Sequence, residues 1–182
     1  MKKEGFVEAL SRIFEKNKVI SHQQSIDLQK SFLSRSDLAF EDFLLEEGLI
    51  EKEDILKALS DYYAVPSMDP IGYFFDHYLV VKFPKGFLLR NLIIPIEVID
   101  DAILMVLASD PADEDLLPLL GAYVSYDIEF RVGIASEIVE TIEEFYDASL
   151  TDLELDDNLI PEVEHELEDE ARRDIEELPE DE

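Results

Sequence analysis

A glycine between two apolar helical segments, Gly48, most constrains how this chain can fold. It follows an apolar half-helix at Leu44, and it can take the left-handed backbone conformation that closes a helix end because it has no Cβ atom. The apolar pair Leu49 and Ile50 comes next, and the acidic residues after it suit the positive end of a second helix. The stretch 44–63 therefore predicts a tight helical hairpin, with the apolar pair filling the gap between its helices.

The hairpin is the second of two similar units in residues 1–64. A shift of 30 residues places Lys18 over Gly48 and Val19–Ile20 over Leu49–Ile50, so each unit consists of a helix, an apolar pair and a helix. Apolar residues at helical spacing predict four short helices in this subdomain. One unit alone cannot bury its apolar stripe, so we expect the two hairpins to pack on each other.

Residues 65–147 have a different pattern, which predicts a small mixed α/β subdomain. Ile93–Ile99 and the run 102–108 are apolar and rich in β-branched residues, and Asp100–Asp101 between them predicts a hairpin turn. The other predicted elements are helical segments over 76–81, 84–91 and 113–123, a strand over 127–134, and a last helix capped by Ser136. The predicted fold class is therefore α+β, with a four-helix subdomain before a short sheet covered by helices.

The net charge of −30 is concentrated at the C-terminal end. Residues 147–182 hold 17 acidic side chains and two arginines, so 148–182 is predicted to be an acidic, disordered linker or tail. A polyanion repels nucleic acid and anionic lipid, which argues against either as a partner. The longest apolar runs are too short to cross a bilayer and the first residues do not resemble a secretory signal, so we expect a cytoplasmic protein without direct membrane insertion.

Three further segments, taken in order with the hairpin, resemble a known family. They are 108–113 (Ala-Ser-Asp-Pro-Ala-Asp), 133–139 (Gly-Ile-Ala-Ser-Glu-Ile-Val) and the aromatic pair at 145–146. Over about residues 35–147 the chain is similar to the N-terminal domain of the type II secretion and type IV pilus assembly ATPases. That resemblance implies a cytoplasmic module that docks a hexameric motor onto an inner-membrane platform protein. The acidic segment resembles the linker that precedes the ATPase module in this family.

The resemblance also implies where a nucleotide would bind, because some members of the family hold cyclic di-GMP in a tandem helical motif. The degenerate motif positions in this chain are Ala39, Phe40, Glu41, Leu44, Gly48 and Tyr62. The family's Arg-Leu-Gly is replaced by Ala39-Phe40-Glu41, and its glutamine by Tyr62. Each lost charge-assisted contact typically costs about 1.5–3 kcal/mol, and Glu41 adds a negative charge near a dianion. We therefore predict no bound cofactor.

The chain holds more aromatic residues than packing alone would require, which leaves two interpretations open. They form a core between the hairpins and the α/β layer, or some of them anchor a partner, since interface anchors are enriched in such residues. The aromatic residues concerned are Phe40, Phe43, Tyr62, Tyr63, Tyr73, Phe74 and Phe75. The candidate partner-binding set is Phe40, Phe43, Leu49, Ile50, Tyr62 and Tyr63.

No motif in the chain supports catalysis. The phosphate-binding pattern G-x-x-x-x-G-K-[ST] is absent, so we do not expect this chain to hydrolyse ATP. His22, His77 and His165 are scattered, which argues against a metal site. Asp110 and Asp113 flank a proline at a predicted helix start, where carboxylates commonly accept backbone N–H groups.

Three hypotheses for the function follow. The first is a non-catalytic docking domain of a secretion or pilus motor, which binds the inner-membrane platform, works with an ATPase module in cis or in trans, and is peripheral to the membrane through its partners. The second is a regulatory domain that senses a nucleotide of the cyclic di-GMP type. The third is a free-standing acidic adaptor that uses its anionic tail.

Overall fold

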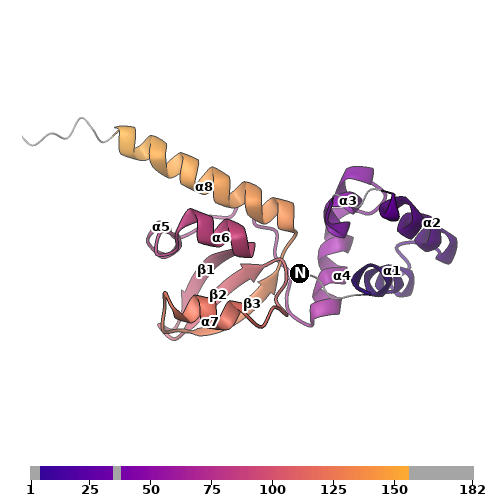
Figure 1. The fold of residues 1–182 in the computed structure, drawn as a ribbon, viewed down its shortest axis with the longest axis horizontal. Helices are drawn as coiled ribbons and strands as arrows, with labels where there is room; N and C mark the ends of the chain where they lie inside the picture. The colour runs from indigo at the N-terminus through magenta and orange to yellow at the C-terminus, as the bar shows by residue number, and fades with distance from the viewer. Residues whose placement is uncertain (1–4, 35–37, 156–182) are drawn as a thin grey trace, which may run out of the picture. The chain divides into compact units, whose positions relative to one another are not determined.

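The computed structural model describes residues 5–34 and 38–155, with side chains up to residue 147. Its elements are α1 (Phe6–Lys16), α2 (His22–Leu33), α3 (Phe40–Glu47), α4 (Lys52–Tyr63), α5 (His77–Val80), α6 (Lys85–Asn91), β1 (Ile93–Ile99), β2 (Ile103–Ala108), α7 (Leu116–Gly121), β3 (Asp127–Val132) and α8 (Ala135–Leu155) (Figure 1). Met1–Phe145 form one compact unit. The predicted α+β fold class is confirmed. Helix α8 extends into the predicted acidic tail as far as Leu155, and the rest of that tail lies outside the described residues.

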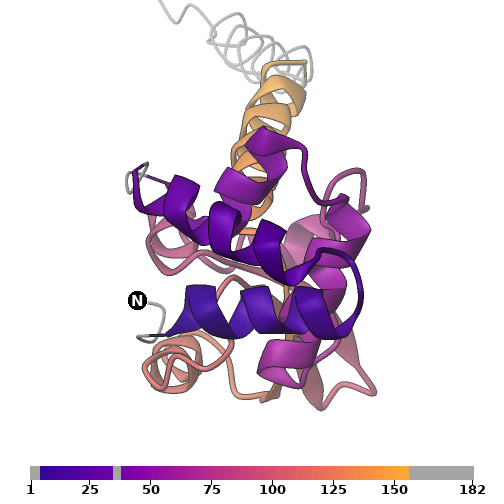
Figure 2. The same cartoon turned by 90° about the vertical axis from the view of Figure 1, so that its right-hand side faces the viewer.

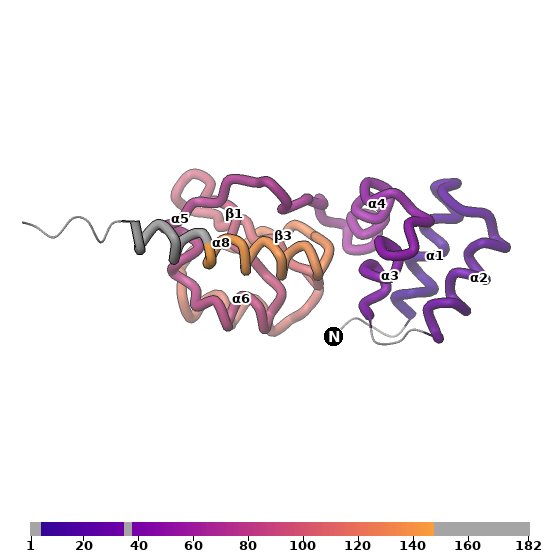
Figure 3. Tube along the Cα trace, turned by 90° about the horizontal axis from the view of Figure 1, so that it is seen from above, coloured from indigo at the N-terminus to yellow at the C-terminus, as the bar shows by residue number. Residues whose placement is uncertain are grey.

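The first four helices form two hairpins with matching backbone geometry (Figure 3). Helices α2 and α4 are each 12 residues long, and they begin 30 residues apart, at His22 and Lys52. The residue before the apolar pair is left-handed in both units, with φ of 61° at Lys18 and at Gly48. No heavy atom lies within 4 Å of where a Cβ on Gly48 would be, so its backbone conformation, and not lack of space, favours glycine there. These matches support the internal duplication.

The hairpins pack on each other through a shared apolar core. Helix α1 packs against α2, which Figure 2 shows beside it, and against α4. The largest fully buried side chains of this core are Leu10, Phe14, Phe43, Leu44, Ile55 and Leu59. This packing agrees with the expectation that neither hairpin buries its stripe alone.

Only one residue of the apolar pair Leu49–Ile50 fills the gap between α3 and α4. Ile50 is buried, whereas the Leu49 side chain is 65% exposed. Consecutive side chains of a non-helical connection point to opposite sides, so only one of the pair reaches the core. The prediction that both residues fill the gap was wrong for Leu49.

The sheet has the strand order β1-β2-β3, with β1 antiparallel and β3 parallel to β2. Asp100 and Asp101 both have positive φ, 52° and 54°, which is the geometry of a two-residue hairpin turn. The predicted hairpin is therefore confirmed. Pro95 has no N–H to donate and lies in an edge strand, where such a residue is tolerated. Figures 1 and 2 show α7 and α8 on opposite sides of the sheet.

Three predicted elements differ from the structure by more than one residue at a boundary. Helix α7 begins only at Leu116, because the Asp113 carboxylate accepts the N–H of Asp115 and holds a turn before it. Strand β3 ends at Val132, since the chain then turns into α8. Helix α8 begins at Ala135, so Ser136 lies inside its first turn and is not its cap. The Ser136 N–H instead lies 3.4 Å from Oδ1 of Asp42.

The helical and α/β halves meet beside β3. Val132 and Ile134 belong to the same buried cluster as the helical core. The segment after α4 lies along β3, where Met68 N–H donates to Val132 O at 2.9 Å and Val132 N–H donates to Pro66 O at 2.9 Å. A Cβ on Gly133 would lie 3.0 Å from Leu107 Cδ1, so this close crossing over β2 favours glycine.

Candidate functional site

A cavity of about 590 Å³ opens where α1, α2 and α3 approach the loops that follow α6 and β2. Its size is in the usual range for small-molecule and cofactor sites. The described residues that line it are Gly5, Phe6, Val7, Glu8, Gln29, Phe32, Leu33, Leu38, Ala39, Phe40, Glu41, Leu92, Ser109, Asp110 and Ala135. Most of this lining is apolar.

The cavity brings together only part of the degenerate nucleotide motif. Ala39, Phe40 and Glu41 line it from the start of α3. The other three positions do not line it: Leu44 is in the helical core, Gly48 closes α3, and Tyr62 is on α4.

Among the described residues of the cavity lining, the ionisable ones are all acidic: Glu8, Glu41 and Asp110. Glu41 is fully buried, from the first turn of α3. A cyclic dinucleotide carries two phosphate charges, and no lysine, arginine or histidine of the described lining would offset them. These three carboxylates therefore disfavour a dianionic ligand.

Half of the candidate partner-binding set is buried. Phe40 and Phe43 are part of an aromatic cluster with Phe32, whose ring centroid lies 5.0 Å from that of Phe40 and 5.5 Å from that of Phe43. Phe40, Phe43 and Ile50 are each at most 5% exposed. Phe40 and Phe43 are therefore part of the buried core, and Ile50 is buried as well.

The other three candidates reach the surface. Leu49 is exposed, and Tyr62 and Tyr63 are half-buried at the end of α4. The Tyr62 ring is edge-on to Phe6, with centroids 5.0 Å apart. Burial raises the pKa of the Tyr63 phenol, and a charge interaction and hydrogen bond with the Asp110 carboxylate raise it further. Docking by Leu49, Tyr62 and Tyr63 stays a prediction.

A charged network that the sequence did not reveal joins the two halves. Nζ of Lys52, in the first turn of α4, lies 2.7 Å from Oδ2 of Asp69 and 2.8 Å from Oε1 of Glu137 in the first turn of α8. Hydrogen bonds to Asp69 and then Glu137 raise the pKa of Lys52. Burial raises the pKa of Glu137, and its hydrogen bond with Lys52 opposes that rise. One feature of the sequence could have indicated this network. Lys52 lies at the start of a helix, where the helix dipole disfavours a cation unless acidic groups lie nearby.

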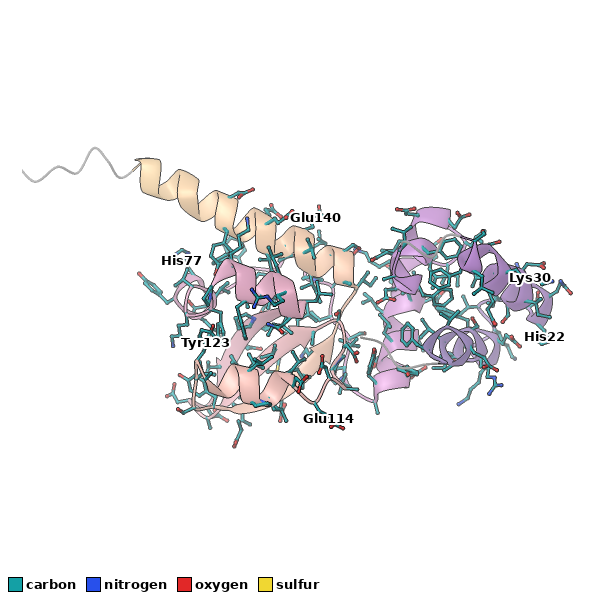
Figure 4. The ribbon with its side chains drawn as sticks, viewed as in Figure 1. His22, Lys30, His77, Glu114, Tyr123 and Glu140 are labelled. Carbon is teal, nitrogen blue, oxygen red and sulfur yellow. The ribbon has the colours of Figure 1, made fainter. Side chains whose placement is uncertain are left out.

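The residues considered for metal or acid–base chemistry do not converge. His22 on α2 and His77 on α5 come from different elements (Figure 4). His22 Nδ1 lies 3.1 Å from Glu15 Oε2, and the His77 ring contacts that of Phe145. His165 lies outside the described residues. In the described part of the chain, no three or more histidine, aspartate or glutamate residues gather as a metal site would require.

No helix among the described residues is both long and apolar enough to span a membrane.

The comparison with known families concerns the α/β half and α8. Residues 74–152 match the family model of the MshEN domain. The predicted resemblance to the N-terminal domains of type II secretion and type IV pilus assembly ATPases is thereby confirmed. No curated protein shows significant sequence similarity to the chain.

Solved structures extend the similarity in fold to the helical half. A structure of MshE with cdg (cyclic di-GMP) is 20% identical, has a TM-score of 0.58, and is aligned over 80% of this chain and 100% of its own. The N-terminal domain of XpsE is 18% identical, has a TM-score of 0.52, and is aligned over 79% of this chain and 97% of its own. Both comparisons concern the fold, and their coverage of this chain extends the likeness beyond residues 74–152.

Proposed function

We propose that this chain is the non-catalytic docking domain of a type II secretion or type IV pilus assembly motor and binds the cytoplasmic part of its inner-membrane platform protein. The observation that carries the proposal is the MshEN domain at residues 74–152. The alignment with all of the solved MshE chain supports it, because the helical half is also present. The ATPase module acts in cis or in trans.

The surface of the chain is consistent with protein binding in the cytoplasm. The large exposed apolar side chains of the described residues lie outside the lining of the 590 Å³ cavity, apart from Leu33. Protein interfaces use such residues as anchors. Attachment to the membrane is then indirect, through the platform protein.

The proposal is tested by calorimetric titration of the 182-residue chain with the purified cytoplasmic part of the platform protein from the same cell. Saturable one-to-one binding without nucleotide is expected. The cytoplasmic part of a platform from an unrelated secretion system is the control. No detectable heat at protein concentrations of about 100 μM, which corresponds to a free energy weaker than about −5.5 kcal/mol, would refute a docking role.

Binding of cyclic di-GMP is a second candidate, favoured by the fold shared with MshE, whose structure was solved with cdg. The acidic cavity lining, with Glu41 at a position where the family has glycine, opposes it. A titration with cyclic di-GMP distinguishes the two. Saturable binding that Glu41→Gln strengthens would place the nucleotide in this cavity, whereas absence of heat at millimolar ligand would remove the candidate.

A further inference from the structure

Strand β3 is an outer strand of the sheet, and one of its two edges pairs with β2 (Figure 1). On that edge, the N–H of Asp127 donates to the carbonyl oxygen of Ala102 at 3.0 Å, and the N–H of Gly133 donates to that of Ala108 at 3.1 Å. The backbone groups of consecutive strand residues point alternately to the two sides. The odd-numbered residues of β3 therefore face β2, and the even-numbered residues face away from it.

The outer edge of β3 is occupied at one end. Val132 donates its N–H to the carbonyl oxygen of Pro66, and its own carbonyl oxygen accepts the N–H of Met68, so this stretch pairs with the end of β3 as a short parallel strand. Ile128 and Phe130 direct their N–H and C=O groups to the same side, and no backbone group of the described residues forms a hydrogen bond with them there. Since buried backbone groups require partners, these groups are available to water or to an added strand.

The two outer strands of the sheet differ in how their edges are protected. An open edge is a template for another strand, and proteins commonly block it with a proline or a bulge. Strand β1 contains Pro95 and an irregularity of register before Glu97. Within Asp127–Val132, β3 contains no proline and pairs with β2 in unbroken register. The backbone of β3 can therefore accept a further strand beside Ile128 and Phe130.

The charges along β3 select the partner strand. Asp127 and Glu129 are exposed, and Arg131 is half-buried. A surface hollow at the start of β3 is lined by Asp101 and Asp127, with Lys82 as its cation. From the start of β1 to residue 147, the chain holds 14 acidic side chains and one basic side chain. Because acidic groups predominate both along the strand and over this half, a strand that carries lysine or arginine is favoured.

A second copy of the chain is disfavoured at this edge. Antiparallel pairing of Ile128 with Phe130 of another copy would place the two Glu129 side chains directly opposite each other. Like charges at such a position destabilise a strand pair, and each copy carries a net charge of −30. The edge therefore suits a basic strand from a different protein.

We propose that the outer edge of β3 binds an extended, basic segment of a partner protein, which joins the sheet through the backbone groups of Ile128 and Phe130. Backbone hydrogen bonds supply affinity in this mode of recognition, and alternate side chains supply specificity. Lysine or arginine of the added strand lies beside Asp127 and Glu129, and its apolar side chains lie beside Ile128 and Phe130, which are half-buried. The inference goes beyond the docking function and does not depend on the identity of the platform protein.

The probe for this edge is a peptide of about ten residues, long enough to span a strand, in which lysine and valine alternate. It is titrated into the isotope-labelled full chain, and nuclear magnetic resonance measures both binding and amide hydrogen exchange. We expect saturable binding, with exchange slowed about tenfold or more at the N–H groups of Ile128 and Phe130. The N–H of Val132 should change little, because it is already bonded to Pro66.

Two control peptides separate strand addition from attraction between charges. The same peptide with methylated backbone nitrogens keeps every lysine but cannot donate hydrogen bonds to β3, and a peptide of alternating glutamate and valine reverses the charge. Both should bind at least about tenfold more weakly. Equal binding of the methylated and unmodified lysine peptides would overturn the inference, and so would the absence of saturable binding at millimolar peptide.

Two substitutions of Phe130 test the same edge from the side of the protein. Phe130→Pro removes the outward N–H, which the sheet itself does not use, and proline is tolerated at such edge positions. Phe130→Val loses the ring but keeps the N–H, so it is the matched control. We expect Phe130→Pro to weaken peptide binding about tenfold and Phe130→Val to leave it within about twofold of the wild type.

Equal peptide binding by the proline and valine variants would contradict strand addition. Circular dichroism establishes that each variant folds. If the proline variant does not fold, the methylated peptide and the amide exchange of Ile128 in the wild type decide the question.

Sedimentation of the wild-type chain alone tests the alternative occupant, a second copy. A monomer at micromolar concentration is expected and supports the assignment. Self-association that Phe130→Pro abolishes and Phe130→Val does not would show that a second copy occupies the edge, and would overturn the assignment to a basic partner.

Discussion

Replacement of Lys52 by methionine tests whether the charged network joins the two halves energetically. Methionine keeps most of the aliphatic stem, so the change removes mainly the ammonium group. The Nζ atom lies 2.7 Å from Asp69 and 2.8 Å from Glu137. Glu137 is 8% exposed, so after the substitution its carboxylate would be left in an apolar environment without this cation.

The expected cost is set by burial of Glu137. Breaking a fully buried ion pair costs about 3–5 kcal/mol, but the Lys52 side chain is 31% exposed, so water screens part of the interaction. Relief of the unfavourable lysine at the N-terminus of α4 reduces the cost slightly further. We therefore expect Lys52→Met to lower the free energy of unfolding by about 2 kcal/mol at pH 7.

The pH dependence follows from the direction of the Glu137 pKa. Burial already raises it in the folded state, against the effect of Lys52. Without Lys52 it rises further, so the protonated form becomes more favoured on folding. A carboxyl group whose pKa is raised in the folded state stabilises the fold at pH values below its pKa in the unfolded chain, which is near 4.3. This stabilisation is lost as pH rises. The deficit of Lys52→Met should therefore be small at pH 4 and grow toward pH 7.

Urea unfolding followed by far-ultraviolet circular dichroism measures these differences, since the chain contains no tryptophan. Lys57→Met, on an exposed position of the same helix, is the matched control. The double variant Lys52→Met with Glu137→Gln should recover most of the loss, because no buried charge remains uncompensated. Equal urea midpoints for the Lys52 and Lys57 variants would refute the reasoning.

Three further predictions use the same unfolding assay. Gly48→Ala should lower the free energy of unfolding by about 1 kcal/mol, because φ at this position is 61°. Lys18→Gly should raise it by about as much, because Lys18 has the equivalent left-handed conformation. An unchanged urea midpoint for both variants would refute the common geometry. Tyr63→Phe should lower the free energy of unfolding by about 1–2 kcal/mol, because the hydrogen bond to Asp110 is lost. The difference from the wild type should disappear as pH rises above the ordinary tyrosine pKa near 10. A difference in stability that persists at that pH would contradict this prediction. Hydrogen bonds from Ser25 and then His22 lower the pKa of Glu15, so Glu15→Gln should lose stability at pH 7 and match the wild type at about pH 2; equal stability at both pH values would exclude that contribution.

The elements with strong local signals could be predicted from the sequence. Gly48 and the apolar periodicity around it determine the hairpin, and Asp100–Asp101 between two β-branched runs determines the strand pair. The exact start of α8 was not predictable from Ser136, because a serine after a small residue resembles a cap whether or not the helix has already begun. Local capping chemistry favours either alternative, and the packing of Ile134 in the core decides between them.

The residues of the candidate site were predicted less well than the fold. Tertiary contacts bring these residues together, and regular spacing along the sequence does not. Lys52, Asp69 and Glu137 lie in three separate segments, so no sequence window contains the network. Leu49 and Ile50 are adjacent and equally apolar, yet one is exposed and the other buried. Sequence chemistry alone assigns both the same role.

The fold is similar to that of MshE, but the cavity lining includes acidic side chains, and this combination bears on which ligands the chain can bind. The cavity has Ala39, Phe40 and Glu41 at its wall, and the ionisable residues of its described lining are all acidic. A buried carboxylate cannot be tolerated beside a dianion without a large pKa shift, since like charges in a low dielectric repel strongly. The apolar lining imposes no such conflict, so the helical fold can persist without the nucleotide. What the chain then offers a partner is its exposed surface, where Phe74 and Tyr78 are the most exposed aromatic side chains of the described residues.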